Sequence, residues 1–221
     1  MIRMALGLSI LLLTACSSTS TETPEASQDQ TSESSSASGG GEVGALCAEG
    51  QEPCPLEPGT YSAAPFEPAF TFLLEDEWMN DRAFADIGGL SQQMGGIYWA
   101  SGVTRGTVGG AEVTIEPTAG GFVAFLQSLA ATGMTVSAPT PTTVDLVEGQ
   151  QIDVATNDVE ASGLYFLAND RFNLGPGEKA RFIVLDHAGV TVVLVLEAFA
   201  EADFDQWLET VAPVVESISW E

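Results

Sequence analysis

A catalytic histidine needs a nucleophile to activate and an acid to orient it, and this sequence offers one histidine, His187. It lies between Asp186 and Gly189, in a run of residue types that predicts a tight turn. No Gly-x-Ser-x-Gly motif and no phosphate-binding glycine loop occurs in the sequence. We therefore interpret His187 as a turn residue, and the sequence predicts no catalytic residue, cofactor-binding residue or metal ligand.

Carboxylates are the other source of chemistry, and the chain has 31 acidic residues against six basic ones. A glycosidase needs only two carboxylates, so the sequence neither supports nor excludes a carboxylate pair. The acidic run Glu75-Asp76-Glu77 is interpreted as a solvated strand end, and the alternative is an acid pair in a groove near Trp78 or Trp99. No zinc-ligand spacing and no Asp-x-Asp-x-Asp-Gly calcium loop is present, although so many carboxylates leave calcium open.

The N-terminal residues predict export. Arg3 precedes the apolar run 5–13, which has the length of a signal-peptide core and is too short to span a bilayer. The sequence Leu-Thr-Ala-Cys that ends at Cys16 resembles a bacterial lipobox, in which the cysteine is lipidated and becomes the first mature residue. We therefore expect residues 1–15 to be a lipoprotein signal peptide and Cys16 to carry the lipid.

Residues 16–45 follow as a run of Ser, Thr, Glu and Gly with almost no apolar side chains. Such a segment cannot recover the entropy of ordering, so we expect a disordered tether between the lipid and one domain at 46–221. Cys47 and Cys54 open that domain. An isolated pair of cysteines in an exported protein usually forms a disulfide, and the alternative, a metal site, lacks both the Cys-x-x-Cys spacing and a nearby histidine.

The net charge of the chain limits the classes of molecule that it can bind. A formal charge of −25 at pH 7 repels phosphate backbones, which argues against nucleic acid. Three of the few basic residues, Arg171, Lys179 and Arg181, fall within one predicted hairpin. They would either pair with nearby carboxylates such as Asp170 and Glu178 or form a docking patch for an acidic group of a partner.

Periodicity places the elements that would position these residues. Strands are predicted at 69–74 and 96–103, a hairpin turn at Glu148-Gly149, and a central strand in the apolar run after Gly189. Apolar residues at helical spacing predict one helix that stops near Gly133, and a second from the N-cap Asp203 that Pro213 kinks or ends. The expected fold class is α+β, an antiparallel β-sheet meander covered by helices.

The order of these elements resembles a known family. The segments that carry the resemblance are Pro58-Gly59-Thr60-Tyr61, Arg181 to Asp186, Gly189 to Val193, and Phe204-Asp205 through Ser217-Ile218. Together they are similar to bacterial secreted proteins and lipoproteins of the PsbP-like fold, including the mycobacterial LpqN type. The resemblance implies an α/β/α sandwich and a function in docking to other macromolecules, with no shared catalytic residues to transfer.

The sequence therefore predicts an extracytoplasmic lipoprotein of the cell envelope, anchored to the membrane at Cys16, that acts as a non-catalytic binding or accessory module for an envelope partner. An envelope hydrolase or carbohydrate-active enzyme with a carboxylate pair, or a small-ligand receptor, is the alternative.

Overall fold

The apolar run after Gly189 forms strand β16 (Val190–Ala198), which lies in the middle of a large sheet. It pairs with β15 (Lys179–His187) on one side and with β7 (Gly95–Ser101) on the other. Because successive side chains of a strand point to opposite faces, Val192 and Leu194 enter one hydrophobic core and Val193 and Val195 enter another. The prediction of a central strand covered on both faces is confirmed.

The structure is a computed structural model that describes residues 42–221 except 49, 65, 158–160 and 169. The predicted signal peptide, Cys16 and all but the last residues of the predicted tether lie outside the described residues. The described residues form one compact unit, in which Gly44 and Ala45 already pair with a strand of the domain. No helix in the described part of the chain is long and apolar enough to cross a membrane.

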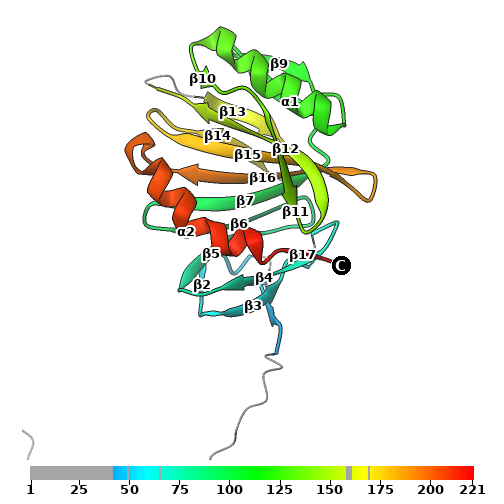
Figure 1. Ribbon diagram of the computed structural model, residues 1–221, viewed down its shortest axis with the longest axis vertical. Coiled ribbons are helices and arrows are strands. Elements are labelled where there is room, and N and C mark those ends of the chain that lie inside the picture. The colour runs from blue at the N-terminus through cyan, green and yellow to red at the C-terminus, as the bar shows by residue number, and fades with distance from the viewer. Residues whose placement is uncertain (1–41, 49, 65, 158–160, 169) are drawn as a thin grey trace, which may run out of the picture. The chain divides into compact units, whose positions relative to one another are not determined.

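The described strands form three sheets (Figure 1), and every pair except β1–β3 is antiparallel. The nine-stranded central sheet adds to β7, β15 and β16 the strands β2 (Cys54–Leu56), β5 (Trp78–Ala83), β6 (Ile87–Gln92), β10 (Thr135–Val136), β11 (Thr140–Val144) and β12 (Val147–Ala155). Its order is β10-β12-β15-β16-β7-β6-β5-β2, with β11 paired to β12.

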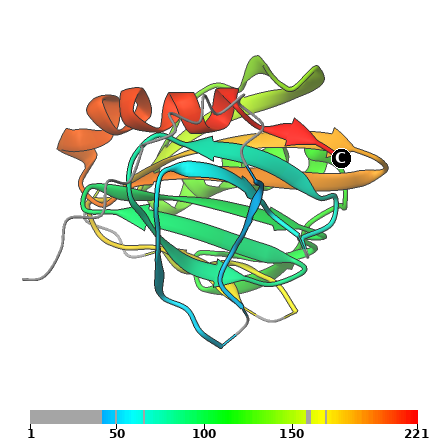
Figure 2. The ribbon, with the colours of Figure 1, turned by 90° about the horizontal axis from the view of Figure 1, so that it is seen from below.

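Two smaller sheets accompany the central one. The first contains β1 (Gly44–Ala45), β3 (Gly59–Ser62), β4 (Phe70–Leu74) and β17 (Ser219–Trp220), and the second, here called the outer sheet, contains β8 (Arg105–Val108), β9 (Ala111–Thr114), β13 (Ala161–Phe166) and β14 (Arg171–Leu174). Residues of the first share a core with α2 (Phe204–Glu216), and residues of the outer sheet share the other core with α1 (Ala119–Ser128). Figure 2 shows α2 along one side of the strands.

The predicted α+β sandwich, a sheet covered by helices, is wrong. The described chain is mostly β, and α1 and α2 are its two α-helices. Much of the cover that we expected from helices comes instead from β3 and β4 on one face of the central sheet and from β13 and β14 on the other. Of the strands in the outer sheet, β8 was missed, because glycines and mixed patterning obscure the two-residue period between residues 102 and 117.

Other local predictions have mixed outcomes. The first helix begins after the N-cap Thr118 and is followed by a 3-10 turn (Leu129–Thr132) that stops at Gly133, which has a positive φ of 95°, as expected. The hairpin turn falls at Asp145-Leu146, both with positive φ, rather than at Glu148-Gly149. Pro213 lies inside α2 and does not end it. A second 3-10 turn (Glu201–Asp203) precedes α2, and Asp203 makes no side-chain cap.

Candidate functional site

The acidic run near the two tryptophans forms no acid pair. Glu75, Asp76 and Glu77 are exposed between β4 and β5. Trp78 packs in the core with its ring 5.7 Å from that of Trp207. Glu77 is the one acid among the residues that line a shallow depression beside it. The cavity beside Trp99 is apolar and about 10 Å³ in volume, too small to hold a substrate.

His187 is the last residue of β15, and Ala188 and Gly189 after it have positive φ, so the predicted tight turn is present. The imidazole lies 4.8 Å, centroid to centroid, from the indole of Trp220, whose Nε1 donates to the carbonyl of Val144. Within the described residues, no three His, Cys, Asp or Glu side chains form a group that could hold a metal ion. Through its contact with Trp220, His187 holds the end of the β15–β16 hairpin beside β17.

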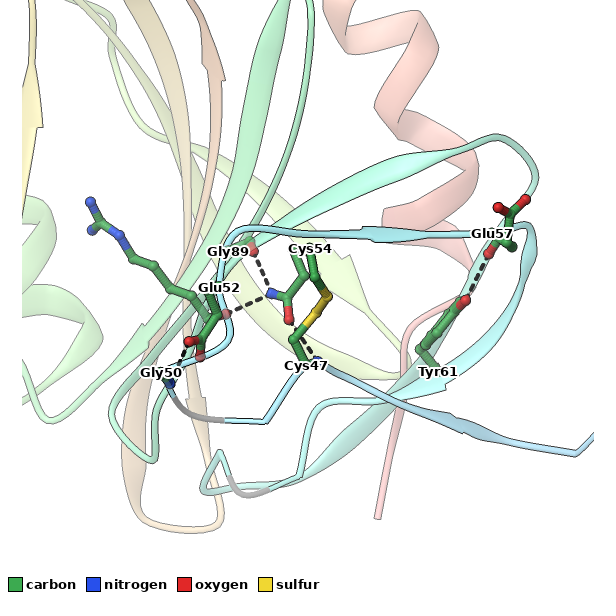
Figure 3. Close-up of a disulfide and its surroundings, with 9 residues drawn as sticks. Cys47, Gly50, Glu52, Cys54, Glu57, Tyr61 and Gly89 are labelled. Atoms are coloured by element: carbon green, nitrogen blue, oxygen red, sulfur yellow. Dashed lines mark hydrogen bonds between the residues drawn. A yellow bond between two sulfur atoms is a disulfide. The ribbon is translucent and has the colours of Figure 1, made fainter.

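Cys47 and Cys54 form the predicted disulfide (Figure 3). The bridge ties the segment before β2 to the edge of the central sheet. Beside it, the buried Asn80 accepts a hydrogen bond from the backbone N–H of Cys47 at 3.0 Å. Both sulfurs are thus consumed by a structural bond that is typical of an oxidising, extracytoplasmic compartment.

The three basic residues of the predicted docking patch do not lie in one sheet. Arg171 is exposed on β14 of the outer sheet, whereas Lys179 and Arg181 lie on β15 of the central sheet. Arg181 forms a two-pronged ion pair with Asp153 across the strands, at 2.7 and 2.9 Å. The ammonium of Lys179 lies 4.3 Å from the centroid of the Phe204 ring of α2. Lys179 and Arg181 therefore already have intramolecular partners.

A site that the sequence reasoning did not identify lies between the central sheet and β14. It is a pocket of about 260 Å³ that we call the carboxyl-pair pocket. Its walls are Arg82 of β5, Tyr98 of β7, Glu197 of β16 with the following Phe199, and Phe172, Asn173, Gly175 and Glu178 in and after β14. Polar groups from four segments of the chain thus converge on one hollow, as in small-molecule sites.

Glu197 is the central residue of this pocket. Although it is an acid, its side chain is only 5% exposed, and its neighbours in the strand are all apolar. Burial raises its pKa to about 9, and the charge of Glu178 and a hydrogen bond with that residue add to the rise, while Arg82 lowers it. Glu197 is therefore protonated at neutral pH, and its hydroxyl donates to the carboxylate of Glu178. The two carboxyl groups are therefore in direct contact.

Glu178 is held by the turn that joins β14 to β15. Its carboxylate accepts a hydrogen bond from the backbone N–H of Gly175. The hydroxyl of Thr156 donates to the carbonyl of Gly175 at 2.6 Å and to the carbonyl of Glu178 at 3.1 Å. This turn is also bonded to the start of the second 3-10 turn, where the N–H of Glu201 donates to the carbonyl of Gly177. The carboxylate is thereby fixed before any ligand arrives.

Tyr98 supplies an aromatic wall because glycines face it on both sides. Gly89 is its partner on β6, and Gly96 lies opposite Glu197 on β7. A β-carbon at Gly89 would lie 2.4 Å, and one at Gly96 2.6 Å, from atoms of the Tyr98 ring. No larger residue fits beneath the ring at these two positions. Burial, followed by the charge of Glu197, raises the pKa of the Tyr98 hydroxyl.

The remaining walls are aromatic and cationic. The ring of Phe172 lies 5.6 Å from that of Tyr98 and 5.2 Å from that of Tyr165. Tyr165 is fully buried, and its hydroxyl has no hydrogen-bond partner among the described residues. Arg82 lies over the Tyr98 ring, 5.9 Å from its centroid, and pairs with Asp170 at 2.9 Å. The charge of Arg82 is therefore balanced at the rim of the pocket.

One signal for this site was present in the sequence. Glu197 interrupts a strand whose other residues from 192 to 198 are all apolar, and a buried acid in such a strand points to a partner or a function. Its partner Glu178 could not be identified, because it depends on the path of the turn after β14. No protein-family model matches this sequence, and no curated protein shows significant similarity to it.

Proposed function

We propose that this protein is a membrane-tethered, extracytoplasmic binding protein whose ligand site is the carboxyl-pair pocket. The observation that carries the proposal is a buried, protonated Glu197 bonded to a fixed carboxylate, Glu178, in a hollow with aromatic walls. A perturbed acid in a pocket with a few converging polar groups is typical of a binding or catalytic site. The disulfide supports the extracytoplasmic placement.

The contact between the two carboxyl groups favours binding over glycoside hydrolysis. Glycosidases hold their two carboxyl groups about 5 to 9.5 Å apart, so that a sugar carbon or a water fits between them. Glu178 and Glu197 are hydrogen-bonded to each other and leave no such space. The His187 ring packs against Trp220 and the described cysteines are bridged, so neither supplies a nucleophile or base in this pocket. We therefore favour a receptor or accessory module over an envelope hydrolase.

A thermal-shift screen of the purified protein against small polar metabolites tests the ligand site. A ligand that binds only the folded state at about 100 times its Kd adds about 2.7 kcal/mol of stability. We expect a stabilising compound whose effect is lost in both Glu178→Gln and Glu197→Gln and kept in Glu209→Gln, a control on the exposed face of α2. A screen without stabilising compounds, or a shift that both pocket variants retain, would contradict the proposal.

The membrane tether makes a separate prediction. Cys16→Ala should move the protein from the membrane fraction to the soluble extracytoplasmic fraction, because stable anchoring needs the acyl chains that the lipidated cysteine carries. The described part of the chain has no helix that could replace the anchor. Fractionation followed by immunoblotting measures the change, with Cys47→Ala as a control that keeps Cys16. A variant that still sediments with membranes would show that the anchor lies elsewhere.

Anchoring would place the pocket in a restricted volume above the membrane. A flexible segment of about thirty residues reaches on the order of 30 Å, which raises the local concentration of the domain near an envelope partner. Crosslinking in living cells, followed by mass spectrometry, would identify such a partner.

A further inference from the structure

We propose that the carboxyl-pair pocket binds a small organic ammonium ion, with Glu178 and Glu197 as its anionic partners and with Phe172 and Phe199 as its aromatic walls. This inference rests on the proposed function, since it names the ligand class of the same site.

Charge inside the pocket favours a cation. Arg82 of β5 is neutralised by Asp170. The other titratable groups around Glu197 are Glu178 from the turn after β14, Tyr98 of β7 and Tyr165 of β13, and neither tyrosine is ionised because burial raises both pKa values. Apart from the Arg82–Asp170 ion pair, the acidic groups of the site are therefore the carboxyl groups of Glu178 and Glu197. The surrounding protein has a formal charge of −25, which raises the local concentration of cations and repels anions.

Aromatic rings complete the recognition of an ammonium group. Rings of Tyr and Phe attract a cation over their faces, and Arg82 already occupies a position over Tyr98. Phe172 and Phe199 also line the pocket, and Phe199 is 42% exposed. Because the pocket measures about 260 Å³, an ammonium group with a few carbon atoms fits it, given about 30 Å³ per water-sized group.

The proton on Glu197 explains how two adjacent carboxyl groups can stay buried in the empty pocket. In the empty pocket, the proton on Glu197 avoids two adjacent negative charges. An ammonium ion that enters supplies the positive charge instead, so Glu197 ionises and its proton leaves to solvent. One positive charge enters and one leaves, and the net charge of the pocket is unchanged. Ligand binding should therefore release a proton at neutral pH.

Calorimetric titration of the full mature protein tests this proposal with four probes at constant ionic strength and pH 7.5: butylammonium chloride, choline chloride, 1-butanol and sodium butyrate. We expect the two ammonium ions to bind roughly tenfold or more tightly than the neutral and anionic probes, since the buried carboxylate discriminates by charge. In two buffers of different ionisation enthalpy, the heats should differ by the release of roughly one proton per ligand.

Two pocket variants and one control separate charge from shape. Glu197→Gln keeps the size and the donor to Glu178 but cannot release a proton, so it should lose proton release and weaken ammonium binding by roughly tenfold. Glu178→Gln should weaken binding similarly, and Glu209→Gln should change neither quantity. Far-UV circular dichroism confirms that each variant is folded. Unchanged proton release in Glu197→Gln, or equal binding of 1-butanol and butylammonium, would overturn the proposal.

These experiments can also contradict the ammonium assignment without contradicting the proposed binding function. Failure of both ammonium probes, together with a neutral or anionic compound whose stabilisation requires Glu178 and Glu197, would overturn the ammonium assignment and leave the binding function standing. Failure of every compound would overturn both.

Discussion

Glu197→Gln should make the domain more stable than the wild type at pH 8, and the difference should shrink towards zero near pH 4.5. The pKa of Glu197 is raised from 4.5 to about 9, first by burial and then by the charge and hydrogen bond of Glu178. The unfolded chain therefore loses this proton at a lower pH than the folded domain does. Between these two pKa values the unfolded state binds fewer protons, so stability falls as the pH rises.

The size of the effect follows from the difference between the pKa values of Glu197 in the unfolded and folded states. Each unit of pKa difference corresponds to about 1.4 kcal/mol, so the cost at pH 8 is on the order of 4 kcal/mol. The amide of the substituted side chain donates to Glu178 as the protonated acid does, but it does not titrate. The variant therefore keeps the hydrogen bond and does not lose stability through this titration as the pH rises. Below pH 4.5 the acid is protonated in both states, and the two proteins should have similar stability.

Urea unfolding at pH 5, 6, 7 and 8 measures the prediction as the difference between variant and wild type. Taking the difference removes the general effect of the many other carboxylates, whose repulsion also changes with pH. The exposed Glu209→Gln should follow the wild type at every pH. A difference that stays constant across this range would mean that Glu197 is ionised in the folded domain at neutral pH.

The same residue shows how far the sequence could be interpreted. The apolar pattern of residues 190–198 was enough to predict a central strand, and the pattern after Gly121 was enough to predict the first helix. Both succeed because each pattern has a clear period over a long segment. The buried acid inside that strand was visible as well, but its partner lies at a turn 19 residues away, and no local pattern encodes that contact.

The failures of sequence reasoning have two physical causes. Strand β6 contains Gly88 and Gly89, which are typical of loops, yet these glycines are required because Trp99 and Tyr98 lie across them on β7. The salt-bridge partner of Arg181 could not be predicted for a second reason. Arg181 was paired with neighbours in the sequence, but the register of β12 and β15 places Asp153 opposite it. Register between strands is set by the whole sheet.

Asn80→Ala should cost about 3 kcal/mol of unfolding free energy, although it removes only one small side chain. Asn80 is 0% exposed and makes three hydrogen bonds. Its Oδ1 accepts from the N–H of Cys47, and its Nδ2 donates to the carbonyls of Arg82 and Gly89 at 2.8 and 2.9 Å. Alanine leaves one donor and two acceptors without this partner, and each buried group costs about 1 kcal/mol or more.

The position of Asn80 explains why its three bonds matter together. The pairing of β5 with β6 shifts register between Asn80 and Arg82, and an irregularity of this kind leaves backbone groups without ladder partners. The side-chain amide satisfies them, and it joins the disulfide segment to the same place. Asn80 therefore holds both the N-terminal segment and the backbone of Arg82, a wall residue of the carboxyl-pair pocket.

A double-mutant cycle with Cys47→Ser and Cys54→Ser tests this coupling. The disulfide closes a short loop and should itself contribute about 2.5 kcal/mol. Without the bridge the segment around Cys47 can move away, so its N–H can bond to water, and Asn80→Ala should then cost about 1 kcal/mol less than in the bridged protein. Asn80→Asp should be worse than alanine in both backgrounds, because an ionised carboxylate cannot donate to the carbonyls of Arg82 and Gly89 and is buried. Urea unfolding of the set gives these values, and strictly additive costs would show that Asn80 supports the β5–β6 pair alone, with no part in holding the disulfide segment.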